Sequence, residues 1–98
     1  MKFAAALLLV ATTAAAADGP ALFKQNCAPC HGTDGSANTP AGKSLHARDL
    51  RSPEVQKLSD AAIAKQIREG KNKMPAFKNL DEGQVAALVG FVRGLAKR

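Results

Sequence analysis

The sequence predicts an all-α domain, and three observations support that fold class. No stretch alternates polar and apolar residues for long enough to indicate a sheet. Four segments after residue 17 carry helix-start signals, each with a capping residue or an early proline. Only seventeen large apolar side chains remain in residues 18–98 once the two cysteines are set aside. A domain this small is marginally stable by itself, so we expect part of its core to come from outside the polypeptide.

Residues 1–17 have the pattern of a cleavable secretory signal peptide. Lys2 gives a positive start, residues 3–11 are an uninterrupted apolar run, and residues 15–17 fit the small-x-small rule for cleavage. A membrane anchor is less favoured, because a spanning helix needs about 20 apolar residues. The expected mature domain, residues 18–98, is exported to a bacterial periplasm, where it is soluble and makes no stable membrane insertion.

The first helix is predicted from Pro20, at its first position, to Asn26. Residues 31–50 are rich in Gly, Asp, Asn and Pro and are predicted to form a loop. Two helices follow. One has Ser52 as its cap and begins at a proline, and the other is capped by Ser59 or Asp60 and ends at a glycine.

The last helix has the clearest signals. Asp81 and Gln84 predict a capping box, and Leu80 and Val85 predict the hydrophobic staple around it. An apolar stripe at helical spacing follows, made of Val85, Leu88, Val89, Val92 and Leu95. The sequence therefore predicts one buried face on this helix.

Cys27, Cys30 and His31 form the Cys-x-x-Cys-His sequence that attaches a c-type haem. On one helical turn the two thiols can reach both vinyl groups of a porphyrin and form thioether bonds. The adjacent imidazole of His31 is then delivered to the iron as an axial ligand. We therefore predict one haem c, covalently attached through Cys27 and Cys30, with its iron.

Other interpretations of the two cysteines are weaker. A thioredoxin-like redox site should follow a strand in a βαβ pattern, which this chain lacks. A zinc site needs four ligands and would use both cysteines and both histidines at unsuitable spacing. A disulfide across two intervening residues closes too short a loop to add much stability.

The sixth iron position separates an electron carrier from a haem enzyme or a gas sensor. Met74 is the only methionine after residue 17, and it lies between a polar stretch and Pro75. A lone methionine is usually core filler, but these neighbours beside a haem motif favour an iron ligand. His46 is the bis-histidine alternative, and its ordinary role would be that of a partly exposed loop residue.

Together these features resemble a class I cytochrome c of the short, monohaem bacterial and algal kind. The resemblance rests on Phe23 four residues before the haem motif, on residues 74–77 (Met-Pro-Ala-Phe) and on the aromatic last helix. It implies three to five helices around one haem, with the first and last helices crossing near a right angle. Gly19 and Phe23 would then meet the last helix near Phe91 and Val92, with the aromatic rings edge to face.

The resemblance also implies that a proline carbonyl accepts a hydrogen bond from His31, and Pro40 is the matching residue. Many relatives carry a tyrosine or tryptophan near a haem propionate, and this chain has neither. Lys43, Arg48 and Arg51 are the candidates for that role.

Ligation by His31 and Met74 leaves no open iron position, so we predict a one-electron carrier and no enzyme. The alternative is a haem protein with an open or labile sixth site, acting as a peroxidase or gas sensor. The apolar shell expected around the haem comprises Leu22, Leu45, Leu50, Leu58, Ile63, Ile67, Phe77, Leu80 and Val89.

The balance of charge is basic, with thirteen Lys and Arg against eight Asp and Glu once residues 1–17 are removed. Acidic patches on redox proteins or membrane complexes are the expected docking partners. The lysines that flank the expected haem crevice are Lys24, Lys43, Lys71, Lys73 and Lys78. Dispersed charge and few aromatics exclude nucleic acid binding, and a monomer is expected.

Overall fold

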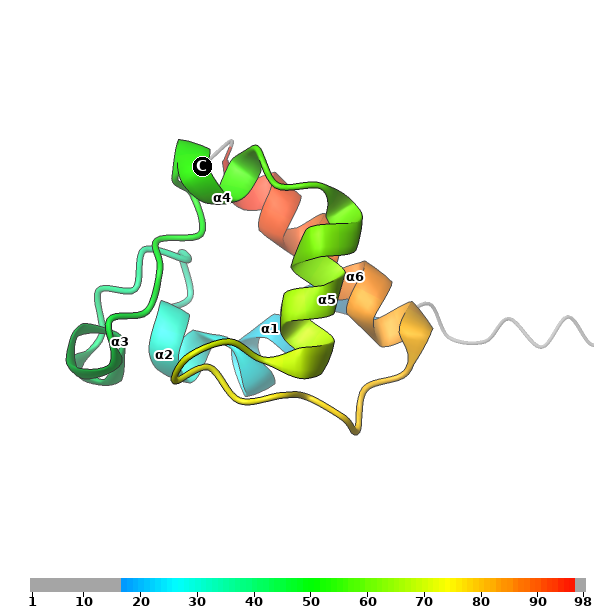
Figure 1. Ribbon diagram of the computed structural model, residues 1–98, viewed down its shortest axis with the longest axis horizontal. Helices are drawn as coiled ribbons and strands as arrows, with labels where there is room; N and C mark the ends of the chain where they lie inside the picture. The colour runs from blue at the N-terminus through cyan, green and yellow to red at the C-terminus, as the bar shows by residue number, and fades with distance from the viewer. Residues whose placement is uncertain (1–16, 97–98) are drawn as a thin grey trace, which may run out of the picture.

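The computed structural model describes residues 17–96, and over this range the chain is helical and contains no strand (Figure 1). The prediction of an all-α fold is confirmed. The predicted signal segment lies outside the described residues, apart from Ala17. The helices are α1 (Gly19–Asn26), α2 (Ala28–His31), α3 (Pro40–Leu45), α4 (Pro53–Gln56), α5 (Asp60–Glu69) and α6 (Glu82–Leu95).

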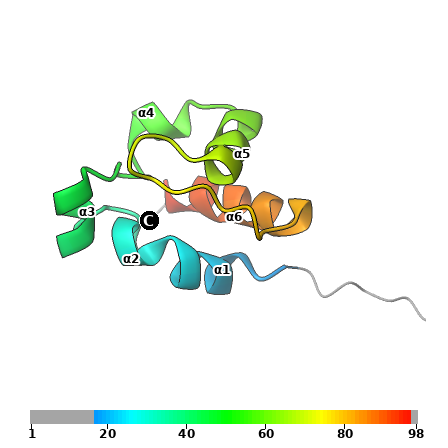
Figure 2. The same cartoon turned by 60° about the horizontal axis from the view of Figure 1, so that its bottom comes forward.

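The first and last helices, α1 and α6, pack against each other (Figure 2). Gly19 permits the close approach, because a Cβ atom on it would lie 2.8 Å from the carbonyl oxygen of Ala87. The ring centroids of Phe23 and Phe91 are 4.5 Å apart. The predicted contact is confirmed, although the rings are tilted at 33° and do not meet edge to face.

The predicted apolar face of α6 is buried along its whole length. Asp81 and Gln84 form the predicted capping box, in which each side chain bonds the other residue's backbone N–H. The α6 stripe packs with apolar residues of α1, α4 and α5 into one core, whose other members include Phe23, Val55, Ile63 and Ile67. The core therefore joins both ends of the described chain to its middle.

The prediction that residues 31–50 form a loop is wrong for residues 40–45, which form the helix α3. Thr39 caps this helix, since its hydroxyl oxygen accepts a hydrogen bond from the Gly42 N–H at 2.8 Å. Pro40 occupies the first turn, where its missing N–H costs nothing. The Thr39 hydroxyl also donates to the carbonyl oxygen of Cys30 at 2.6 Å, which bonds α3 to the cysteine segment.

Arg93 on α6 fixes the connection between α4 and α5. Its Nε donates to Asp60 Oδ1 at 2.8 Å, and its other nitrogens donate to the carbonyl oxygens of Gln56, at 2.6 Å, and Leu58. The Gln56 amide donates in return to the carbonyl oxygen of Val92 at 2.9 Å. One planar guanidinium thus satisfies three acceptors, one each in α4, in the connection and in α5.

We expect Arg93→Lys to lower the free energy of unfolding by about 1–3 kcal/mol, because an ammonium group cannot match three acceptors spread over a planar fork. Urea denaturation of the haem-loaded protein measures the change. Arg68→Lys, at an exposed position of α5, is the control and should stay within about 0.5 kcal/mol of the parent. Equal midpoints for Arg93→Lys and the parent would contradict this role.

Candidate haem site

The cysteine segment follows α1 directly: Cys27 ends α1, and α2 forms the single helical turn that the sequence predicts. The backbone N–H groups of Cys30 and His31 both donate to the carbonyl oxygen of Cys27, at 3.2 and 2.9 Å. The two cysteines are half-buried and are not bonded to each other. Both thiols are therefore available on one turn for attachment to a single group.

The environment of Cys27 favours a neutral thiol. Burial raises the pKa of Cys27 to about 11, and the neighbouring Cys30 adds to the rise. Within residues 17–96 no cluster of three or more His, Cys, Asp or Glu side chains could hold a metal ion. The structure therefore gives no support to a zinc centre at the cysteines.

A cavity of about 470 Å³ lies beside the cysteine turn, and its wall is mainly apolar. Six of the nine expected shell residues line it, namely Leu45, Leu50, Leu58, Ile63, Ile67 and Phe77. Leu22, Leu80 and Val89 do not: they pack within or against the protein core. Four large apolar lining residues were not among those expected, namely Phe23, Val55, Leu88 and Val92.

The same cavity is lined by Cys27, Cys30, His31 and Met74. Its volume is within the range of cofactor sites, roughly 300–1,000 Å³. Two thiols for covalent attachment, the imidazole of His31 and the thioether of Met74 converge on an apolar space, and together they match the donor set of one haem c. The residues present therefore fit the group that the sequence predicts.

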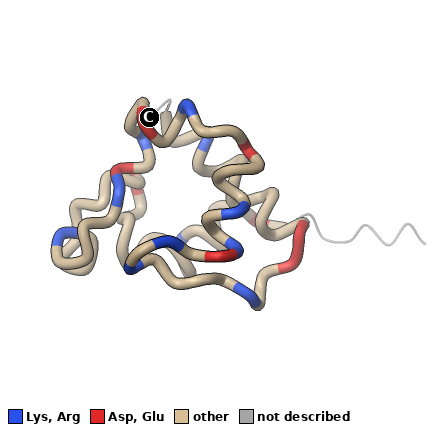
Figure 3. The backbone as a smooth tube through the Cα atoms, in the orientation of Figure 1, with Lys and Arg blue, Asp and Glu red and all other residues tan. Residues whose placement is uncertain are grey.

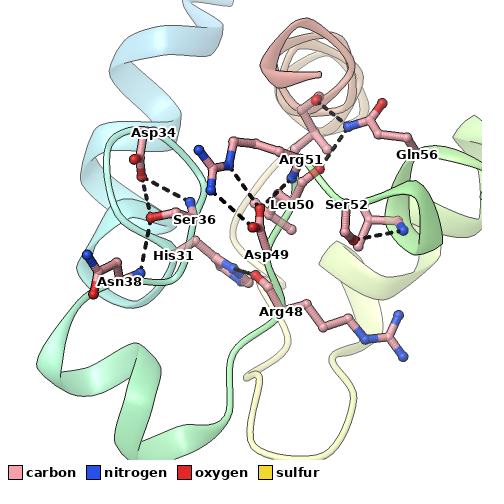
Figure 4. Close-up of polar contacts among 12 residues, drawn as sticks. His31, Asp34, Ser36, Asn38, Arg48, Asp49, Leu50, Arg51, Ser52 and Gln56 are labelled. Atoms are coloured by element: carbon pink, nitrogen blue, oxygen red, sulfur yellow. Dashed lines mark hydrogen bonds and ion pairs between the residues drawn. The ribbon is translucent and has the colours of Figure 1, made fainter. Parts of the chain in front are cut away.

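His31 is held by a backbone carbonyl. Its Nδ1 lies 2.9 Å from the carbonyl oxygen of Arg48 (Figure 4), so the Nδ1–H donates and Nε2 carries the free lone pair. Burial lowers the pKa of His31, and the bond to Arg48 only partly opposes that effect. The ring is therefore neutral at pH 7, which is the form that binds a metal.

The prediction that Pro40 accepts this bond is wrong. Pro40 is exposed in the first turn of α3, and Arg48 takes its place as the acceptor. Any residue can offer a backbone carbonyl, so no side-chain signal in the sequence marks Arg48 for this role. The path of the chain after α3 determines which backbone carbonyl reaches His31.

Met74 lies in the segment between α5 and α6, which Figure 2 shows in yellow above α1 and α2. Gly70 ends α5 with φ of 73°, and a Cβ there would lie 2.5 Å from the Met74 carbonyl oxygen. Paired backbone hydrogen bonds of 3.1 and 2.9 Å join Lys71 and Met74 in a tight turn. His46 also lines the cavity, but it is exposed at the end of α3.

Known proteins resemble this chain over most of its length. The family model described as "Cytochrome C oxidase, cbb3-type, subunit III" matches residues 14–92. The cytochrome c6 of Cyanidium caldarium is 32% identical over 80 residues, which cover 82% of this chain and 71% of that protein. The cytochrome c6 of a Nostoc species is 37% identical over 87 residues, covering 88% of this chain and 76% of that protein.

A solved structure, the KustC0563 c-type cytochrome, superimposes with a TM-score of 0.71 at 43% sequence identity. The match covers 80% of this chain and 96% of that one. It confirms the cytochrome c fold.

These similarities also identify the cofactor, because the matched region contains the whole haem-attachment sequence. One haem c with its iron is held covalently, with Cys27 and Cys30 in the attachment positions. None of the helices within residues 17–96 is long and apolar enough to cross a membrane. The matched relatives indicate an electron carrier. The chain therefore belongs to the class I c-type cytochromes.

Proposed function

We propose that the protein is a one-electron carrier in which His31 Nε2 and the Met74 sulfur hold the haem iron from opposite sides. The observation that carries this proposal is that His31 and Met74 line one cavity with both cysteines. The bound haem supplies an iron that accepts and returns one electron. With both His31 and Met74 bound to it, the iron would have no position left for dioxygen or peroxide.

The surrounding residues favour the reduced state. A neutral thioether from Met74 stabilises the lower charge on the metal. The apolar wall, which includes Ile63, Ile67 and Leu88, excludes water and opposes the additional positive charge. His31, fixed in one tautomer by Arg48, provides the stronger donor on the other side.

We also propose where the carrier works and how it docks. Cleavage after Ala17 would release an exported, monomeric protein into the periplasm. Lys71 and Lys73 line the cavity and are exposed, and further basic residues lie on α3 and on the segment before α6 (Figure 3). This basic rim would steer the protein onto acidic patches of redox proteins or membrane complexes, with salt-sensitive association.

Replacement of the sulfur ligand tests the axial pair. We expect Met74→Leu, which keeps the apolar volume, to abolish the long-wavelength absorption band that marks sulfur-ligated ferric c-type haem. The variant should also gain carbon monoxide binding and show a lower reduction potential. His46→Ala is the matched control and should retain the parent spectrum. An unchanged band in Met74→Leu, or a band lost in His46→Ala, would overturn the ligand assignment.

A further inference from the structure

The carbonyl of Arg48 lies in an irregular segment, yet both sides of that segment are anchored. On one side the Ala47 N–H donates to the carbonyl oxygen of Gly42 at 2.9 Å. On the other side the Leu50 N–H donates to the carbonyl oxygen of Gly35 at 2.8 Å. The remaining freedom is the rotation of the peptide group between Arg48 and its successor.

Asp49 removes that freedom. Its Oδ1 accepts hydrogen bonds from the Arg51 N–H at 2.9 Å and from Arg51 Nε at 3.1 Å, and its Oδ2 accepts one from Arg51 Nη2 at 3.1 Å (Figure 4). The Asp49 carbonyl oxygen also accepts from the Ser52 N–H at 3.1 Å. The Arg48 carbonyl and the Asp49 N–H belong to one rigid, planar peptide group. Fixing Asp49 therefore fixes the direction of the Arg48 carbonyl oxygen.

We propose that Asp49 and Arg51 are positioning residues for His31. Their two-pronged contact orients the Arg48 peptide group so that its oxygen stays bonded to Nδ1–H, and this bond sets the donor strength of the imidazole. The inference rests on the proposed function of His31 as an axial ligand. It adds two residues that do not line the cavity.

The energetics favour a role in orientation over one in stability. The Asp49 and Arg51 side chains are 42% and 39% exposed, and exposed ion pairs contribute little to the free energy of folding. The hydrogen bond from Arg51 lowers the pKa of Asp49, so the carboxylate stays charged over the neutral range. A two-pronged Arg–carboxylate contact is directional, which suits it to holding a peptide plane.

The test measures solvent exchange of the His31 Nδ1 proton by NMR in the reduced, haem-loaded protein. In Asp49→Asn and in Arg51→Gln we expect exchange to accelerate roughly five-fold, the loss expected for one ordinary hydrogen bond. Glu54→Gln is the matched control, because Glu54 is an exposed acidic residue on neighbouring α4. It removes one negative charge and should leave the exchange rate unchanged.

The reduction potential provides a second readout, because the direction of its shift distinguishes a pure charge effect from a weaker imidazole donor. Charge alone would move the potential up in Asp49→Asn and down in Arg51→Gln. A weaker imidazole donor moves it up in both variants, because screening limits the effect of exposed charges. Upward shifts in both variants therefore support the proposal. Shifts of opposite sign with unchanged proton exchange would overturn it.

The two variants and the two readouts separate failure of the positioning role from failure to fold and from failure of the axial assignment. If Asp49→Asn fails to accumulate with haem, Arg51→Gln alone decides, since it leaves the Asp49 backbone turn in place. Failure of the axial assignment would appear in the visible spectrum of the Met74 and His46 variants. Failure of the positioning role would appear as unchanged proton exchange in a protein with a normal spectrum.

Discussion

Replacing both Cys27 and Cys30 by alanine is expected to leave the chain largely unfolded. The two sulfurs hold the group that fills a cavity of about 470 Å³ lined by core residues such as Val55 and Leu88. At about 24 cal/mol per Å³, leaving a void of that size costs at most about 11 kcal/mol. Small domains have roughly 5–15 kcal/mol of stability in total. Water entering past exposed Lys71 lowers the cost, but it cannot replace the lost apolar contacts.

Far-ultraviolet circular dichroism during heating measures this outcome. We expect low helicity and no cooperative transition in the double variant. The control is the parent chain made without haem, which should behave in the same way if the cofactor, and not the sulfur atoms, supplies the stability. A compact form with a cooperative transition in either sample would contradict the expectation.

Gly42→Ala is expected to destabilise the protein by about 3–5 kcal/mol, among the largest effects of a single substitution. A Cβ atom at this helical position would lie 2.4 Å from the Cys30 carbonyl oxygen, 2.5 Å from that of Ala37 and 2.8 Å from Thr39 Oγ1. Two of these atoms are backbone and cannot rotate away. The added methyl would force α3 from the cysteine turn and break the hydrogen bond between Thr39 and Cys30.

Gly90→Ala is the matched control for that substitution. Gly90 is also helical, but nothing lies within 4 Å of an added Cβ atom. The same chemical change should therefore stabilise the protein by up to about 1 kcal/mol through helix propensity. Urea denaturation of both haem-loaded variants gives the two values. If both substitutions changed the free energy of unfolding in the same direction, the packing of Gly42 against Cys30 would not be the cause of the loss of stability.

The parts of the fold that the sequence predicted are those with local signals. Asp81 and Gln84 mark the start of α6 by their own side-chain chemistry, and the residue spacing that follows shows which face is buried. The α3 helix is not evident from the sequence because Pro40 and Gly42 are residue types typical of loops. Thr39 before a proline is the cap signal that could have revealed it.

The site, like the fold, has one part that the sequence predicts and one part that it does not. Its chemical groups, the thiols, the imidazole and the thioether, are side chains at positions that the sequence shows directly. The hydrogen-bond acceptor for His31 is a backbone oxygen of a residue 17 positions later in the chain. Its position depends on the path of the backbone and not on the type of residue. Val55 was also missed, because a four-residue helix is too short to show which face is buried.

The packing of α1 on α6 has a consequence for the order of biosynthesis. Ribosomes make α1 before α6, so the contact between the Phe23 and Phe91 rings can form only after Phe91 has been synthesised. Until then α1 lacks the helix against which it packs in the folded protein. The cysteine turn is therefore synthesised before Leu88 and Val92 of α6, which supply part of the cavity wall.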